Sequence, residues 1–339
     1  MSQMWCLQEA VVLQSAAQSV DQRTPKRQPK RWSKRWIVQT RWNRLFRMRD
    51  LEFLVLGSGT SAGIPTIGCD CAVCRSDDPR DKRLRTSAAI RFIDAQDQPR
   101  TILIDASPDL RQQVLRSGID RCDAILFTHN HVDHTFGLDE VRRFNVTMKA
   151  PIDIYAEPHT LDHLNRVYQH IFQRERNVND SFVATLIPHE IQPGVTLDLF
   201  GLQIEPIRLL HGRLPILGYR IEAPGLEVPN PLPLAWCTDV SSVPPESWGR
   251  LESLQTLFLD MLRERHHPTH LNLDQALDMA DRIAAAQSWF IHMAHDISHQ
   301  ELDSRLPAGV GLAWDGQLIG SGGPSRSSSS SSEATESRS

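Results

Sequence analysis

Four side chains of the types that bind transition metals lie within six residues of this sequence. They are His129, His131, Asp133 and His134, and they directly follow an apolar run, residues 124–127, that predicts a buried strand. Imidazole and carboxylate ligands together suit Zn, Mn or Fe, and two such ions about 3.5–4 Å apart commonly serve phosphoester hydrolysis. A histidine-rich surface turn is the alternative, but this density of ligands after a strand argues against it. We therefore predict a metal centre at the end of this strand.

The run resembles the H-x-H-x-D-H signature of the metallo-β-lactamase superfamily. The resemblance implies that His129 and His131 bind a first metal, and that Asp133 and His134 bind a second. It also implies three later ligands, each at the end of a predicted strand. His211 would be the third ligand of the first metal. Asp239 would be the carboxylate that bridges the two metals, and His292 would be a ligand of the second metal. A lone histidine or aspartate at a strand end is more often structural, but the order of the three supports the set.

Asp105 ends a further predicted strand, over residues 101–105. The resemblance implies that its carboxylate orients a ligating histidine, which fixes the tautomer and the direction of the ring. An ordinary aspartate in a turn is the alternative, and the spacing does not exclude it.

Three cysteines, Cys69, Cys71 and Cys74, also stand within six residues. Structural zinc prefers a closed tetrahedral set of ligands, so this cluster needs one more. The candidate is His295, which lies three residues beyond His292. Free cysteines in a loop are the alternative, although the C-x-C-x-x-C pattern is fairly specific for metal. The sequence thus predicts one structural Zn in addition to two catalytic divalent metals, Zn or Mn.

In combination, these features resemble the PhnP-like branch of the superfamily, which contains a phosphoribosyl cyclic phosphodiesterase. The resemblance rests on the cysteine cluster and on the runs at residues 103–111 and 292–295. It implies catalytic roles for Asp133 and Asp239, and it places His270 against the substrate. The alternative for His270 is a residue that caps the loop before the next helix, or that contacts a phosphate oxygen without transferring a proton.

The expected activity is hydrolysis of a small phosphodiester, such as a phosphoribosyl cyclic phosphate, by attack of a metal-bound hydroxide. One alternative is an RNA-processing endonuclease similar to tRNase Z, although the sequence shows no clear insertion that would grip a long substrate. Another is a metal-stabilised binding protein, which would have no need of a two-metal centre with an open position. We expect a small-molecule phosphodiester as the partner, and a homodimer is left open.

The charge distribution makes nucleic acid an unfavourable partner. Residues 1–50 contain 11 Lys+Arg and 3 Asp+Glu, a net charge of +8, which leaves 26 minus 38, or −12, for the rest of the chain. An acidic body does not attract a long polyanion by counterion release. No run approaches the roughly 18 apolar residues of a membrane span, and the cysteines form no disulfide framework. We therefore expect a cytoplasmic protein without membrane contact.

The pattern of elements predicts an α+β fold, with two mixed sheets packed face to face and helices outside, as in the αββα sandwich of the superfamily. Apolar runs predict strands over residues 51–57, 101–105, 124–128, 152–156, 202–210, 234–237, 257–259 and 289–291. Helical periodicity predicts helices over residues 108–117, 158–173 and 273–286, the last with Asn272 as its N-cap.

The sequence predicts one hydrolase domain over residues 48–320, between two flanks of different composition. Residues 1–47 are basic and lack a regular period, which predicts a disordered extension. The alternatives are an arm for nucleic acid or a membrane surface, or a translation start at Met48. Residues 321–339 form a serine-rich tail that we also expect to be disordered.

Overall fold

A computed structural model of the chain describes residues 48–173, 182–226 and 231–320. The predicted basic extension, residues 1–47, and the predicted serine-rich tail, residues 321–339, lie outside the described residues. Among the described helices, none is both long enough and apolar enough to cross a membrane.

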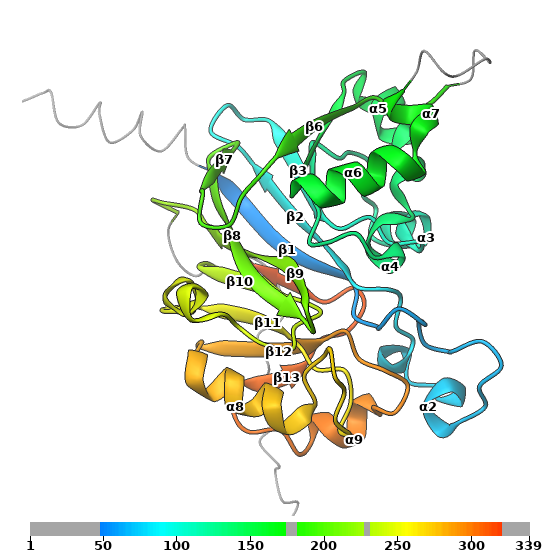
Figure 1. The fold of residues 1–339 in the computed structure, drawn as a ribbon, viewed down its shortest axis with the longest axis vertical. Coiled ribbons are helices and arrows are strands. Elements are labelled where there is room, and N and C mark those ends of the chain that lie inside the picture. Colours follow the sequence, from blue (N-terminus) through cyan, green and yellow to red (C-terminus); the bar gives the residue numbers. More distant parts are fainter. Residues whose placement is uncertain (1–47, 174–181, 227–230, 321–339) are drawn as a thin grey trace, which may run out of the picture. The chain divides into compact units, whose positions relative to one another are not determined.

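The first of two seven-stranded sheets carries the order β14-β1-β2-β3-β4-β5-β6 (Figure 1). Strands β3 to β6 run parallel to one another, whereas β14, β1, β2 and β3 pair antiparallel. The strands are β1 (Arg49–Gly57), β2 (Ser87–Ile93), β3 (Pro99–Ile104), β4 (Ala124–Leu126), β5 (Ile152–Ala156), β6 (Leu186–Glu190) and β14 (Leu318–Gly320). The last strand of the described chain therefore pairs with the first.

The second seven-stranded sheet has the order β13-β12-β11-β10-β9-β8-β7. Strands β10 to β13 are parallel, and β7 to β10 pair antiparallel. The strands are β7 (Leu197–Leu199), β8 (Leu202–His211), β9 (Leu214–Glu222), β10 (Leu234–Cys237), β11 (Thr256–Asp260), β12 (Gln287–Ile291) and β13 (Val310–Leu312). Both sheets are mixed, which confirms the predicted fold class.

Strand β1 shows how one strand can serve both faces of its sheet. Phe53 and Val55 face the second sheet, where the Phe53 ring stacks on Phe258 with 4.9 Å between ring centroids. Leu54 and Leu56 point the other way, into a separate apolar cluster that includes side chains of helices. Because successive side chains alternate between faces and both faces are covered, this part of the strand is an uninterrupted apolar run.

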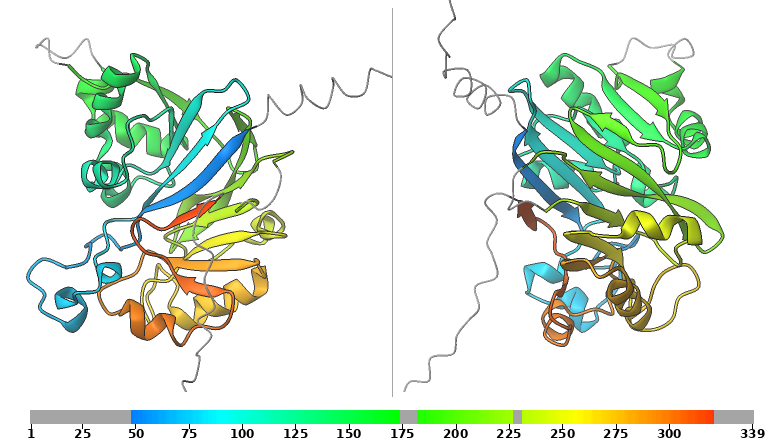
Figure 2. Two further views of the ribbon diagram at one scale, coloured as in Figure 1. Left: turned by 180° about the vertical axis from the view of Figure 1, so that it is seen from behind. Right: turned by 90° about the vertical axis from the view of Figure 1, so that its left-hand side faces the viewer.

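Helices cover the outer faces of both sheets (Figures 1 and 2). The helices on the first sheet are α3 (Leu110–Arg116), α5 (Arg142–Met148), α6 (Pro158–Val167) and α7 (Gln169–Phe172). Those on the second are α8 (Leu273–Ile283), α9 (His299–Asp303) and the 3-10 helix η4 (Pro245–Leu251). The loops contain the short elements α2 (Ala72–Arg75), η1 (Pro79–Asp81), α4 (Val132–Thr135) and η2 (Leu138–Val141). The layers are therefore helix, sheet, sheet and helix.

Two predicted helices differ from those observed. The helix predicted over residues 158–173 is divided into α6 and α7, because Tyr168 has a non-helical φ of −107° and ψ of 46°. The Tyr168 hydroxyl donates to the carbonyl of Thr135 at 3.0 Å, which fixes this break against the loop after β4. The helix predicted over residues 273–286 ends early, because Ala284 is left-handed with φ 55°.

Strands β2, β6, β7, β9, β13 and β14 have no counterpart in the sequence prediction. In β2, Arg91 interrupts the apolar pattern, and its charge is balanced by Glu52 on the neighbouring strand at 2.7 Å. Strand β9 continues directly from β8 through a tight turn in which Gly212 has φ 63°. Strands β2 and β9 are both stabilised by pairing with the adjacent strand, so a local sequence pattern does not predict them.

The N-terminus of α8 provides a test of local stability. Asn272 accepts a hydrogen bond from the backbone N–H of Gln275 at 3.1 Å, and the Gln275 side chain accepts one from the backbone N–H of Asn272 at 3.1 Å. Because Asn272→Ala leaves the backbone N–H of Gln275 without its acceptor, it should lower the free energy of unfolding by about 1 kcal/mol. Urea denaturation measures the change. Asp278→Ala, on the exposed middle of the same helix, should change it by only a few tenths, and an equal loss in both variants would contradict the capping role.

Candidate active site

The predicted ligands lie at the ends of strands from both sheets. In the first sheet, the signature run leaves the carboxyl end of β4 and includes α4; in the second, the ligands end β8 or follow β10 and β12. The ligands form two overlapping groups, and within each group the ligand atoms lie within 4.8 Å of one another. The first group is His129, His131, His211 and Asp239, and the second is Asp133, His134, Asp239 and His292. Asp239 belongs to both groups, which is the position that a bridging carboxylate needs.

Hydrogen bonds orient the histidines of the first group. The Nδ1–H of His211 donates to the carbonyl of Thr269 at 2.7 Å, so its Nε2 is left as the ligand atom. The Nδ1 of His129 lies 3.0 Å from the hydroxyl oxygen of Thr128, and this hydroxyl donates to Asp105 at 2.9 Å. The Nε2 of His129 then faces Asp239, 3.9 Å from its nearer oxygen.

The second group is built around two carboxylates. The Nε2 of His134 lies 3.3 Å from an oxygen of Asp133 and 3.3 Å from an oxygen of Asp239. The Nε2 of His292 lies 3.3 Å from Asp239 and 3.7 Å from Asp133. On its other side, the Nδ1 of His134 donates to Asp105 at 2.7 Å. Asp105 therefore makes the contact that the sequence prediction assigned to it.

Three buried ring nitrogens show that this set of residues fits a metal. The Nε2 atoms of His129, His134 and His292 have no hydrogen-bond partner within the described part of the chain. A buried polar atom without a partner is costly, and buried nitrogens beside carboxylates are the donors that divalent transition metals prefer. The ligand roles of these residues remain predictions, and the geometry is consistent with them.

The electrostatics of the site favour a cation. Burial alone would lower the pKa of His134, but Asp239, Asp133 and Asp105 raise it well above its usual value. Burial likewise opposes ionisation of Asp239, yet His292 and His134 hold its pKa well below the usual value. The carboxylates therefore stay ionised and create a negative potential at the ring nitrogens, which a divalent cation would neutralise.

Three residues of the site adopt a strained backbone conformation. Asp105, Asp239 and His292 have φ values of 62°, 58° and 62°, in the left-handed region that few residues other than glycine adopt. Each lies just beyond the end of a strand, β3, β10 or β12. The turn directs each side chain toward the metal groups instead of along its sheet, and such strain is often found at functional sites.

The sequence prediction missed Asp260, at the end of β11. Asp260 is fully buried, and its Oδ1 accepts a hydrogen bond from the Nδ1 of His270 at 3.0 Å and lies 3.5 Å from the Nδ1 of His292. Its other oxygen accepts from the backbone N–H of Leu271 at 2.9 Å. Asp260 is the last residue of an apolar strand, and Asp105 directly follows one. An aspartate at the end of an apolar strand was the sequence pattern that could have identified Asp260. His270 is thereby held beside the second group, and its predicted role against a substrate stays a prediction.

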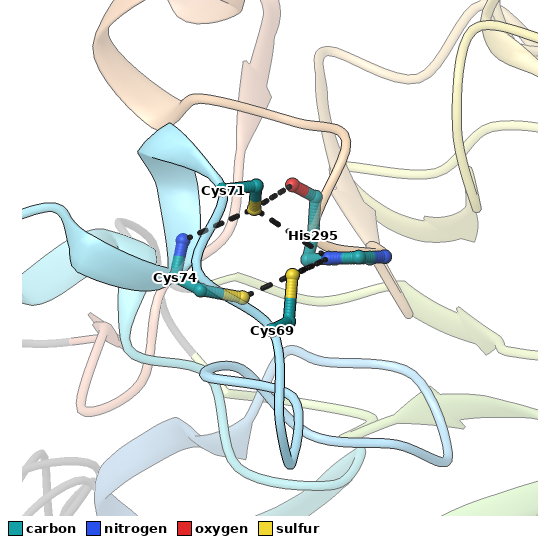
Figure 3. A group of neighbouring side chains, drawn as sticks. All are labelled: Cys69, Cys71, Cys74 and His295. Carbon is teal, nitrogen blue, oxygen red and sulfur yellow. Dashed lines mark hydrogen bonds between the residues drawn. The ribbon is translucent and has the colours of Figure 1, made fainter.

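The three clustered cysteines also meet their predicted partner. Figure 3 shows the thiols of Cys69, Cys71 and Cys74 around His295, with sulfur to Nδ1 distances of 3.2, 3.6 and 3.7 Å. The backbone N–H of Cys74 lowers the pKa of Cys71 to about 6, which favours the thiolate that binds metal. Three sulfurs and one nitrogen are a suitable set for tetrahedral Zn.

Comparison with known proteins decides the family. Residues 100–293, more than half of the chain, match the sequence model of the beta-lactamase superfamily domain. The chain belongs to the metallo-β-lactamase superfamily. Within it, a solved structure described as a new diphosphatase from the PhnP family is 39% identical, covers 80% of this chain and 98% of its own, and has a TM-score of 0.70. The chain is therefore a member of the PhnP family, which confirms the predicted resemblance.

Two more distant solved structures share the fold alone. Zn(2+)-bound PqqB from Methylobacterium extorquens is 21% identical over 79% of this chain and 99% of its own, with a TM-score of 0.60. The short form of human tRNase Z is 18% identical over 79% of this chain and 98% of its own, with a TM-score of 0.56. At these identities neither structure indicates a substrate.

The curated relatives differ in name and are longer than the region they share with this chain. An octanoyltransferase of Porphyromonas gingivalis is 38% identical over 268 residues, which are 78% of this chain and 51% of that protein. A coenzyme PQQ synthesis protein B of Rhodopseudomonas palustris is 32% identical over 181 residues, which are 48% of this chain and 56% of that protein. The chain thus spans about half the length of the curated relatives it matches.

The cysteine cluster leads to a prediction about metal content. If the cluster and both overlapping groups bind metal, elemental analysis of the purified protein should approach about three metal ions per chain. Cys71→Ser should remove about one of them and lower the melting temperature, because structural metal binding contributes to folding. Cys122→Ala, at a buried cysteine outside the cluster, should retain all of them. Unchanged metal content in Cys71→Ser would rule out a structural zinc site here.

Proposed function

We propose that the chain is a two-metal phosphohydrolase that cleaves a P–O bond in a small phosphodiester or diphosphate ester. The observation that carries the proposal is the overlap of the two ligand groups at Asp239, with His270 held beside the second group. Bound divalent metals would supply a Lewis acid for the phosphate oxygens and would lower the pKa of an attacking water. We further propose Zn or Mn in the two catalytic positions and Zn among the cysteines.

His270 is suited to assist departure of the leaving group. Its Nδ1 is engaged by Asp260, and the residue as a whole is 8% exposed. The centroid of its ring lies 4.5 Å from that of His211 and 4.8 Å from that of His292. The Nε2 has no hydrogen-bond partner within the described residues, so it is available to a substrate. Because Nδ1–H is donated to Asp260, a proton for the leaving group would come from Nε2 of the protonated ring, and the Asp260 carboxylate is placed to stabilise that positive charge.

Two small substrate classes fit this arrangement, and both contain a phosphorus atom with two ester or anhydride links. A cyclic phosphodiester is the class expected from the sequence, whereas the 39% identical PhnP-family structure is described as a diphosphatase. RNA processing is a weaker candidate, because the likeness to tRNase Z shows the fold alone and the body of the chain is acidic. Acyl transfer is not proposed, because the shared region is 51% of the octanoyltransferase.

A panel of phosphate substrates tests the proposal directly. We expect the purified protein to hydrolyse cyclic phosphodiesters or diphosphate esters, to lose activity in a chelator and to regain it when Zn or Mn is restored. The measurement is release of the alcohol or phosphate product before and after chelation. Activity that survives complete metal removal, or an absence of activity on every phosphate ester in the panel, would contradict the proposed function.

His270→Ala distinguishes a proton donor from a structural residue. An alkoxide needs a proton as it leaves, whereas a nitrophenolate leaves readily without one. The substitution should therefore reduce kcat about 10²–10⁴-fold on an alkyl or ribosyl diester. On a nitrophenyl diester, the reduction should be much smaller.

The control for this experiment is the metal content of the same His270→Ala sample. With metal retained, equal losses on the two substrates would leave His270 only a positioning role. If metal were lost, His270 would be a ligand and the proton-donor role would be wrong.

A further inference from the structure

Three imidazoles form a row that leads outward from the metal groups. The ring of His292 stacks on that of His270 with 4.8 Å between centroids, and the centroid of His270 lies 5.1 Å from that of His267. Exposure rises along the row, from 1% at His292 and 8% at His270 to a partly exposed ring at His267. His267 is the outermost ring of the row, and the function proposed above gives it no role.

The contacts of His267 determine which ring nitrogen carries its proton. The backbone N–H and the hydroxyl of Thr269 lie 3.4 and 3.2 Å from its Nδ1, so Nδ1 is the acceptor. Burial, His270 and Arg263 lower the pKa of His267, which favours the neutral ring. The proton is therefore on Nε2, which has no hydrogen-bond partner in the part of the chain that the structure describes.

Thr269 ties the orientation of His267 to the metal groups. Its carbonyl accepts the hydrogen bond of His211 at 2.7 Å, while its N–H and hydroxyl hold His267. Its methyl carbon also packs closely on Gly212, where an added Cβ would lie 2.8 Å from Cγ2. One residue thus positions a predicted ligand and the outer imidazole together.

We propose that His267 binds a second phosphate of the substrate by donating a hydrogen bond from Nε2. This inference rests on the proposed function and narrows its substrate class to diphosphate esters. In such a molecule one oxygen joins the two phosphorus atoms. When the first phosphate is at the metals, the second phosphate therefore lies farther from them, toward solvent. His267 likewise lies farther from the metal groups than His270 does, by one ring of the row. The row therefore presents one donor to the leaving oxygen and another to the adjoining phosphate.

Competitive inhibition provides the test, with a nitrophenyl diester as the reporter substrate. The probes are methylenediphosphonate, which carries two phosphorus groups and is not hydrolysed, and methylphosphonate, which carries one. His267→Ala should raise the inhibition constant of methylenediphosphonate about tenfold or more, since a hydrogen bond to a charged group is lost. The inhibition constant of methylphosphonate and the metal content should stay nearly unchanged.

Two further variants separate a lost donor from a disturbed loop. His267→Gln places an N–H donor near the position of Nε2, so it should restore much of the lost inhibition. His266→Ala removes the exposed neighbouring imidazole and should leave both inhibition constants as they are. Equal changes for the two phosphonates, or no change for methylenediphosphonate, would overturn the role of His267.

The same experiment distinguishes failure of this inference from failure of the proposed function. If the wild-type protein hydrolyses the reporter but His267→Ala does not alter the ratio of the two inhibition constants, only the inference fails. If the wild-type protein hydrolyses no phosphodiester, the proposed function fails. In that case, calorimetric titration of the metal-loaded wild-type and His267→Ala proteins with the two phosphonates still measures whether His267 recognises the second phosphorus group.

Discussion

The buried carboxylate of Asp105 is the constraint on which the geometry of the site depends. It accepts hydrogen bonds from the Thr128 backbone, the Thr128 hydroxyl and the His134 ring, so it fixes both ends of the signature turn. Backbone hydrogen bonds hold the same two segments together. The N–H of Ala106 donates to the carbonyl of His134 at 2.8 Å, and the N–H of Gly137 donates to the carbonyl of Ala106 at 2.8 Å. A carboxylate without these donors would be costly to bury, so the carboxylate and the turn require each other.

A feature of the fold or the site could be predicted from the sequence when the residues that form it are close together along the chain. The signature run, the cysteine cluster and the cap at Asn272 are local patterns, and each is a set of neighbouring residues whose chemistry can be recognised without a fold. Asp260 is different, because its importance comes from two histidines that only the sheet order brings to it. The unpredicted strands have the same cause: Arg91 in β2 is acceptable in a strand because Glu52 lies beside it.

One short segment joins the cysteine cluster to the two overlapping ligand groups. His292 and His295 belong to different ligand sets, and the residues between them are tied down on both sides. Met293 exchanges backbone hydrogen bonds with Ser58 and Thr60, and Ala294 donates to Leu262. The carbonyl of Ala294 also accepts from the buried guanidinium of Arg83, which pairs with Asp81. His295 of the cluster thus lies on the loop from which His292 extends, so a metal bound by the cysteines would anchor that loop.

The left-handed backbone at Asp239 and His292 limits how the metal preference of this protein could change. Aspartate, asparagine, histidine and glycine tolerate that conformation best, whereas most other residues bear a penalty of about 1–2 kcal/mol there. Exchange of either residue for glutamate or cysteine, the usual way to shift a site toward a harder or softer metal, would therefore be opposed by the main chain. His131 and His211 have no such backbone. The same holds for His129, Asp133 and His134, so the main chain would oppose redesign toward another ion least at the positions other than Asp239 and His292.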